Sequence, residues 1–226
     1  MPYVMIGLIV FVLSLKKLLR LAIVKGYLGE RQVDRVLKQA ALSYGGLECW
    51  DMMFQDDRSS SQVDNLLLTQ KALYVCEVKN YRGRIFGSPA QEQWTMTLLS
   101  TFTKRNKRGK KVKRTHLSKH RFYNPIRQNT THIRKIKQVL EIYPNVPIIN
   151  LVIFGPKADL SNVAHLKEVV PVKHLLKTIS SIESSLNQTL TIENQIDMID
   201  VLFLANITDK RARKAHVKNL KIRYGK

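Results

Sequence analysis

Two acidic residues and a lysine, Asp64, Glu77 and Lys79, have the types and the spacing needed for phosphodiester chemistry. Carboxylates that oppose each other across a sheet repel, and buried carboxylates need partners or they take up protons. A divalent cation between two carboxylates removes this conflict, and Mg²⁺ or Mn²⁺ prefers oxygen ligands. Water bound to such a cation beside a lysine can hydrolyse a phosphodiester. These residues therefore indicate metal-dependent hydrolysis, provided that the fold brings them together.

A β-hairpin is the simplest structure that joins the three residues. The apolar runs Gln62–Thr69 and Ala72–Asn80 each have about the length of a strand, and two polar residues separate them. With the turn between those polar residues, opposed residues have numbers that add up to 141, which sets Asp64 across from Glu77. Because side chains alternate along a strand, Lys79 shares the face of Glu77. We therefore predict that two carboxylates and an ammonium group share one patch.

A less demanding interpretation treats the same residues as surface groups. A Glu-x-Lys triplet arises by chance roughly once in a chain of this size. Asp64 would then be a strand-edge residue, and Glu77 and Lys79 a surface ion pair. Apolar neighbours favour the buried patch, namely Leu66, Leu67, Leu68, Leu73, Val75 and Val78.

A further acidic residue, Glu30, belongs to a predicted amphipathic helix over about Leu28–Leu42. Glu30 precedes the apolar residues Val33 and Leu37 by three and seven positions, so it lies on the core-facing side of the helix. An acid in the first turn commonly interacts with the helix macrodipole. The alternative is a third carboxylate that points to the metal patch.

Positive charge is concentrated in two segments of a chain whose formal net charge is +21. Lys104–Arg121 holds ten Lys or Arg and no acid, and a turn at Asn106–Gly109 would make it a protruding hairpin; Lys210–Lys226 holds eight and reads as a basic helix. Such segments bind phosphates without sequence preference, or alternatively anionic lipid. The predicted nucleic-acid contacts are Lys104, Arg105, Lys107, Arg108, Lys110, Lys111, Lys113 and Arg114.

The amino-terminal segment Tyr3–Leu15 is uncharged and strongly apolar, and basic residues follow it. As a helix it would cover about 20 Å, which is less than the roughly 30 Å of a hydrocarbon core, but the apolar stretch Leu18–Val24 can extend it. We expect a single-pass anchor in the cell membrane with the rest of the protein on the cytoplasmic side. A buried core helix is the alternative.

The remaining pattern alternates between strands and helices. Asn124–Ile142 is a predicted helix with an Asn-Pro start, and Gln128, His132 and Lys135 form a polar stripe beside its apolar side. A lone histidine such as His132 is typical of a helix surface. Further strands are predicted at Leu47–Phe54, Trp94–Phe102, Ile148–Phe154 and Val169–Val172, and further helices at Lys173–Leu186 and about Ile192–Ala205.

Several motifs together resemble the nuclease-related (NERD) domain of the PD-(D/E)XK, or restriction-endonuclease-like, nuclease superfamily. They are GYLGE at 26–30, SQVD at 61–64, CEVKNY at 76–81, the Gly83–Trp94 stretch and NPIRQ at 124–128. The resemblance implies a core of helix, three antiparallel strands, helix and a further strand. It also implies that the metal-site pattern falls on Glu30, Asp64, Glu77 and Lys79, that Gln128 faces the site, and that valine replaces the proline before Asp64.

We therefore expect an α/β protein with a mixed sheet in three parts: an anchor helix (1–25), a nuclease-like domain (26–160) and a helical extension (161–226). The expected function is a membrane-anchored nuclease that uses Mg²⁺ or Mn²⁺, with Asp64 and Glu77 as metal ligands. Its expected partner is nucleic acid, DNA in preference to RNA. The alternative is a tether without catalysis that grips nucleic acid or anionic lipid through its basic segments.

Overall fold

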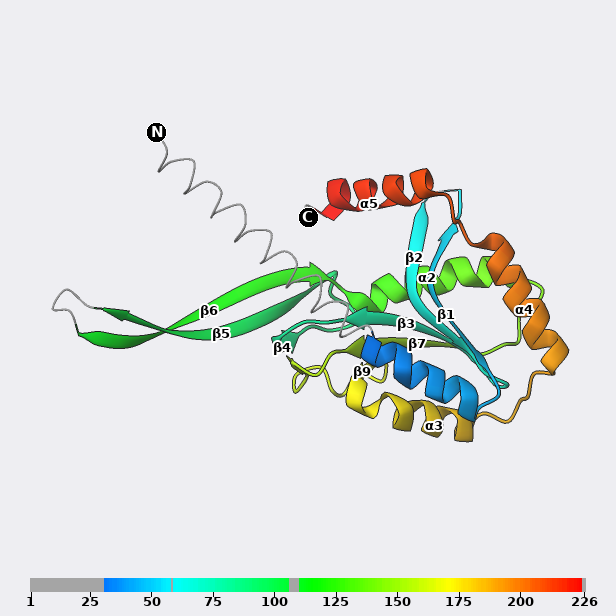
Figure 1. Cartoon of the computed structure of the whole chain (residues 1–226), viewed down its shortest axis with the longest axis horizontal. Helices are drawn as coiled ribbons and strands as arrows, with labels where there is room; N and C mark the ends of the chain where they lie inside the picture. The colour runs from blue at the N-terminus through cyan, green and yellow to red at the C-terminus, as the bar shows by residue number, and fades with distance from the viewer. Residues whose placement is uncertain (1–30, 58, 106–109, 225–226) are drawn as a thin grey trace, which may run out of the picture.

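The structure, a computed structural model, describes residues 31–57, 59–105 and 110–224 (Figure 1). Its elements, in chain order, are a first helix whose described part covers residues 31–43, β1 (Leu47–Gln55), β2 (Ser60–Leu68), β3 (Leu73–Lys79), β4 (Gly83–Phe86), β5 (Gln93–Arg105), β6 (Lys111–Tyr123), α2 (Pro125–Val139), β7 (Ile148–Phe154), β8 (Ala158–Asp159), β9 (Val169–Pro171), the 3₁₀ turn Val172–His174, α3 (Leu175–Ser185), α4 (Ile192–Ala205) and α5 (Lys210–Tyr224).

A five-stranded mixed sheet forms the centre of the molecule. Its strand order is β1-β2-β3-β7-β9, in which β1, β2 and β3 are antiparallel neighbours and β7 and β9 run parallel to β3. Helix α2 makes the connection from the antiparallel part to β7. The expected order of helix, three antiparallel strands, helix and strand is therefore confirmed, although α2 ends at Val139 rather than Ile142. The chain turns there because the Tyr143 N–H bonds the Leu140 carbonyl just before a proline.

The central hairpin has the predicted register. Its pairs run from Leu68↔Leu73 to Asn65↔Cys76, so that partner numbers add up to 141. Gln-Lys is not a preferred two-residue turn, and the hydroxyl of Thr69 stabilises it by accepting hydrogen bonds from the N–H groups of both Lys71 and Ala72.

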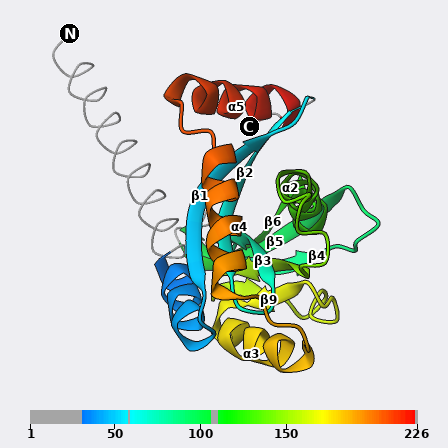
Figure 2. The ribbon, with the colours of Figure 1, turned by 90° about the vertical axis from the view of Figure 1, so that its right-hand side faces the viewer.

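Helices cover both faces of the central sheet (Figures 1 and 2). On one face the first helix and α3 bury an apolar cluster that includes Leu37, Tyr74 and Ile179. On the other face α2 and α4 pack over a second cluster, in which Ile136 and Met198 meet β2 and β3. The strand residues between these layers are therefore apolar on both sides, which explains the continuous apolar runs in the sequence.

A second sheet, of order β6-β5-β4-β8, continues from the end of β3 and carries a long arm. At its base, Ile85, Trp94 and Phe122 pack with the start of α2 in a third apolar cluster. Beyond the base, β5 and β6 extend away from the body as a twisted two-stranded ribbon (Figure 1). The basic segment predicted to protrude thus forms a hairpin arm.

Helix α5 lies beside the ends of β1 and β2 (Figure 2), where Arg213 pairs with Asp51 and His216 bonds Ser60. The predicted basic helix is therefore confirmed. Across the described part of the chain, no helix has both the length and the apolar character that crossing a membrane requires. The predicted anchor, residues 1–25, lies outside the described residues.

Candidate functional site

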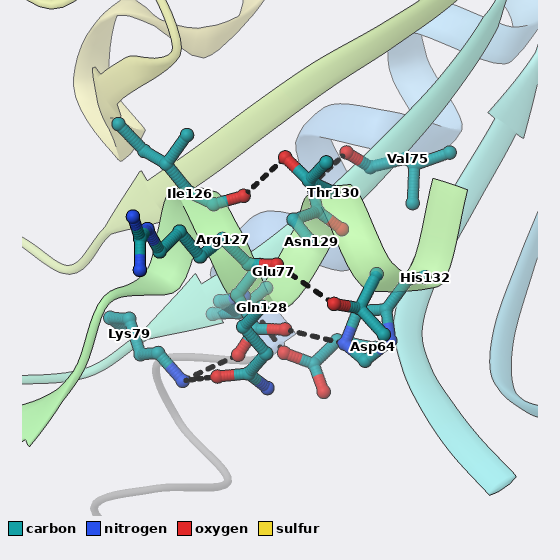
Figure 3. A network of polar contacts seen from close by, with 12 residues as sticks. Asp64, Val75, Glu77, Lys79, Ile126, Arg127, Gln128, Asn129, Thr130 and His132 are labelled. Atoms are coloured by element: carbon teal, nitrogen blue, oxygen red, sulfur yellow. Dashed lines mark hydrogen bonds and ion pairs between the residues drawn. The ribbon is translucent and has the colours of Figure 1, made fainter. Parts of the chain in front are cut away.

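Five polar side chains from three elements converge at the α2-covered face of the central sheet (Figure 3). Asp64 comes from β2, Glu77 and Lys79 from β3, and Gln128 and His132 from α2. The two helix residues are four positions apart and therefore share one side of α2. Glu77 has the same strand parity as Leu73 and Val75, which α2 covers, and Figure 3 shows the Asp64 carboxylate on the same side. The sheet and the helix thus assemble one polar cluster within an apolar layer.

Glu77 is buried, and a separate donor occupies each of its carboxylate oxygens. The ammonium group of Lys79 contacts Oε1, and Nε2 of His132 lies 3.2 Å from Oε2. Burial would raise the pKa of Glu77, but the Lys79 charge and the His132 ring outweigh it and hold that pKa below its ordinary value. Glu77 is therefore an ionised carboxylate inside the protein.

Lys79 interacts with both acids and with a residue of α2. Besides its contact with Glu77, Nζ donates to Oε1 of Gln128 over 3.1 Å. Burial would lower the pKa of Lys79, but the carboxylates of Glu77 and Asp64 outweigh it and raise that pKa. The charge of Asp64 therefore acts on the same ammonium group, and Lys79 is held protonated between the acids and the amide.

Asp64 is half-buried, and its carboxylate accepts a backbone hydrogen bond where the β2–β3 ladder ends. The regular pairs stop at Asn65↔Cys76, and Asp64 would oppose Glu77 in the next pair. Its Oδ2 accepts the N–H of Val78 at 2.8 Å, one residue further along β3. This bond fixes the carboxylate over β3, on the side where Figure 3 shows the Glu77 carboxylate.

Two asparagines set the position of α2. The Asn124 side chain accepts from the N–H groups of Ile126 and Arg127 at the helix start and donates to backbone carbonyls of the 88–91 loop. Inside the first turns, Asn129 donates to the carbonyl of Val75 on β3 at 2.7 Å and to that of Leu151 on β7 at 3.3 Å. These bonds hold α2 across the β3–β7 junction, where His132 contacts Glu77 and Gln128 accepts a hydrogen bond from Lys79.

The structure brings together some of the predicted site residues and leaves others undescribed. Asp64, Glu77, Lys79 and Gln128 meet as predicted. Glu30, Lys107 and Arg108 lie outside the described residues. Among the predicted nucleic-acid contacts, Lys104, Arg105, Lys110, Lys111, Lys113 and Arg114 lie at the exposed end of the arm.

His132 is the site residue that the sequence analysis missed. It is not a surface residue: only 5% of it is exposed, and its ring contacts Glu77. The available signal was its spacing of four from Gln128, which places both on one side of α2. Lys135, the next member of the same stripe, is also buried and pairs with Asp56 at 2.7 Å.

The donor chemistry suits a hard divalent cation. Mg²⁺ is commonly bound through one or two carboxylates with several waters, and Asp64 and Glu77 supply that number. Within residues 31–57, 59–105 and 110–224, no group of three or more histidine, cysteine, aspartate or glutamate side chains is placed to hold a metal ion. Asp64 and Glu77 are thus two carboxylates on one face of the sheet, with Lys79 and His132 as their neighbours.

A family model described as the nuclease-related domain matches residues 25–155, which is more than half of the chain. The chain belongs to the NERD family. This family is placed in the PD-(D/E)XK superfamily, and the match includes every described residue of the cluster and the whole arm. The chain is also similar to an uncharacterized protein of Bacillus anthracis, with 31% identity over 207 residues that cover 89% of this chain and 86% of that protein. No solved structure matches.

Proposed function

We propose that this NERD protein is a metal-dependent nuclease that hydrolyses phosphodiester bonds of nucleic acid. The observation that carries the proposal is the convergence of Asp64, Glu77 and Lys79 on one face of the sheet, with Gln128 reaching them from α2. Two carboxylates beside an ammonium group form a combination that supports metal-dependent phosphodiester hydrolysis. Membership of a nuclease-related family supports the same reaction class.

The side chains have separate roles in this proposal. Asp64 and Glu77 hold Mg²⁺ or Mn²⁺, which when bound neutralises phosphate charge and makes water more acidic. Lys79 orients the attacking water and offsets the negative charge that builds up on the phosphate. Gln128 fixes the ammonium group through its 3.1 Å bond and is placed to orient a phosphate oxygen. His132 holds the second oxygen of Glu77 and so orients that carboxylate.

The basic arm and α5 supply the substrate's binding surface in the same proposal. Both carry Lys and Arg at exposed positions, and phosphate contacts of this kind give affinity without sequence preference. We propose DNA as the substrate in preference to RNA. Anchoring by residues 1–25, with the nuclease-related domain on the cytoplasmic side, stays a prediction from the sequence.

The test is a cleavage assay on purified protein with single- and double-stranded DNA and RNA. We expect Mg²⁺-dependent cleavage that EDTA abolishes and that falls by about 10² or more in Asp64→Asn, Glu77→Gln and Lys79→Met. Arg127→Gln is the control, because Arg127 is exposed and directs its Nε to the Pro89 carbonyl. Cleavage that persists in EDTA, or variants as active as the control, would refute the proposal.

A tether without catalysis is the second candidate, and one observation favours it. Both oxygens of Glu77 already have donors, so the buried charge is compensated without a metal. A tether predicts no cleavage at any Mg²⁺ or Mn²⁺ concentration, with nucleic-acid binding unchanged in Asp64→Asn. The nuclease predicts cleavage in the parent protein and retained binding in the same variant.

A further inference from the structure

The arm is an exposed ribbon that the fold itself does not need. Every residue from Leu99 to Arg105 on β5 and from Lys111 to Leu117 on β6 is exposed. A two-stranded hairpin without a packed face is marginally stable in water. An element of this kind is better explained by what it contacts than by the support it gives the domain.

The strand register divides the arm into two chemically different faces. Partners on β5 and β6 have numbers that add up to 216, so odd positions share one face and even positions share the other. The odd face, which we name the threonine–lysine face, consists of Thr95, Thr97, Leu99, Thr101, Thr103, Arg105, Lys111, Lys113, Thr115, Leu117, Lys119 and Arg121. The even face, the mixed face, consists of Trp94, Met96, Leu98, Ser100, Phe102, Lys104, Val112, Arg114, His116, Ser118, His120 and Phe122.

The base of the arm decides which face is directed outward. On the mixed face, Trp94 and Phe122 are buried against Ile85 in the third apolar cluster. The threonine–lysine face therefore starts on the opposite, solvent side of the second sheet. It carries five of the seven Lys or Arg residues of the two strands, and neither strand contains an acid.

We propose that the threonine–lysine face is the surface that binds the sugar–phosphate backbone of nucleic acid, an assignment that rests on the proposed function. Lysine, arginine and threonine side chains all donate to phosphate oxygens. A two-stranded ribbon is also narrow enough to enter the major groove of a duplex. The mixed face contributes little, because Phe102 and Val112 interrupt its charges.

An anionic membrane fits this surface less well than nucleic acid does. Insertion between lipids needs a continuous apolar side beside the basic one. On the outer part of the mixed face, Lys104, Arg114 and His116 separate the apolar side chains from one another. On the threonine–lysine face only Leu99 and Leu117 are apolar, and they form a single pair.

Two charge-matched variants of the full chain test the assignment. Lys111→Gln with Lys113→Gln removes two charges from the threonine–lysine face, and Lys104→Gln with Arg114→Gln removes two from the mixed face at the same end of the arm. Binding of a fluorescent DNA duplex and of a single strand is measured by anisotropy in EDTA over a series of salt concentrations. We expect the first variant to raise the Kd about tenfold and to reduce the duplex salt slope by about 1.8. The second should raise the Kd less than about threefold.

Lys119→Gln with Arg121→Gln, near the base, should reproduce the effect of the first variant. Equal losses from both faces, or no loss from either, would overturn the assignment. The assignment would also be overturned if the Lys111→Gln, Lys113→Gln variant lost binding to phosphatidylglycerol vesicles while its DNA binding stayed unchanged. Because binding is measured in EDTA, face-dependent binding by a protein that never cleaves would refute the nuclease proposal alone. Cleavage with face-independent binding would refute the face assignment alone.

Discussion

Glu77 combines burial with ionisation because two donors compensate its charge. Its exposed fraction is 2%, and Lys79 and His132 contact different oxygens. A buried carboxylate without such partners would take up a proton. The same compensation fixes both oxygens in direction, and a carboxylate with a fixed direction and a retained charge is what a metal ligand requires.

The depressed pKa of Glu77 makes part of the stability depend on pH. A carboxyl group whose pKa is lower in the folded than in the unfolded protein stabilises the fold above its unfolded pKa, and this stabilisation is lost as the pH falls through the folded pKa. Glu77→Gln, which leaves Lys79 without its carboxylate, should lower the unfolding free energy by roughly 3 kcal/mol at pH 7.

Urea unfolding between pH 7 and pH 3 measures this effect. The difference between the parent protein and Glu77→Gln should shrink as the pH falls, because protonated Glu77 no longer compensates Lys79. Glu92→Gln is the control, since Glu92 is an exposed carboxyl group. A difference that stays constant across this range would contradict the linkage.

His132 is expected to act on the reaction through Glu77. His132→Ala removes the donor to Oε2, so the carboxylate loses its fixed direction. Losing such a partner commonly costs 10- to 100-fold in metal affinity or activity, and we expect the Mn²⁺ concentration for half-maximal cleavage to rise by about that factor. His165→Ala, at an exposed position, should leave it unchanged. Loss of the maximal rate with unchanged metal dependence would argue against this role.

For individual residues, the sequence predicts those site positions that strand geometry determines. Alternation along the strands and the position of the turn place Asp64, Glu77 and Lys79 on one face. The histidine could not be predicted in the same way. Its burial depends on the position of α2 over the sheet. Residues that are distant in the sequence determine that position.

Among the elements, α2 controls the geometry of the site because it carries both Gln128 and His132. Asn124 fixes its start through five hydrogen bonds, two accepted and three donated. Asn129 attaches its first turns to β3 and β7. A small shift of this helix would separate the Gln128 amide from Lys79 and the His132 ring from Glu77.

Asn124→Ala should therefore cost more stability than loss of an ordinary helix cap. A lost N-cap costs about 1 kcal/mol, and the carbonyls that lose their donors add about 1–3 kcal/mol. Thr191→Ala, which removes the cap of α4, is the matched comparison and should cost about 1 kcal/mol. Chemical denaturation gives both values. Equal losses would show that the bonds from Asn124 to the 88–91 loop do not stabilise the fold.

Element boundaries could be predicted well where local pattern decides them. Strand β7 and helix α4 have the predicted limits, and the Asn-Pro start of α2 is correct. Of the second sheet, the sequence predicts the strand Trp94–Phe102 and the basic hairpin but not β8, because β8 joins β4 by two parallel pairs that leave no sequence pattern.

On the scale of the whole molecule, the basic segments lie apart in sequence and in place. The arm extends from the second sheet, while α5 is attached to the far end of β1 and β2 through Arg213 and His216 (Figure 1). The sequence predicts both as basic but cannot place α5, because its attachment depends on single polar pairs with strand residues 156 and 162 positions earlier.

The central claim is that Asp64 and Glu77 bind a divalent cation next to Lys79. Electron paramagnetic resonance of free Mn²⁺ during titration of the full chain tests it most directly, since the signal disappears when the ion is bound. We predict binding by the parent protein with an affinity that Asp64→Asn lowers at least tenfold, while the thermal midpoint stays within a few degrees. Equal Mn²⁺ binding by the two proteins, or none by the parent protein at millimolar Mn²⁺, would contradict the account.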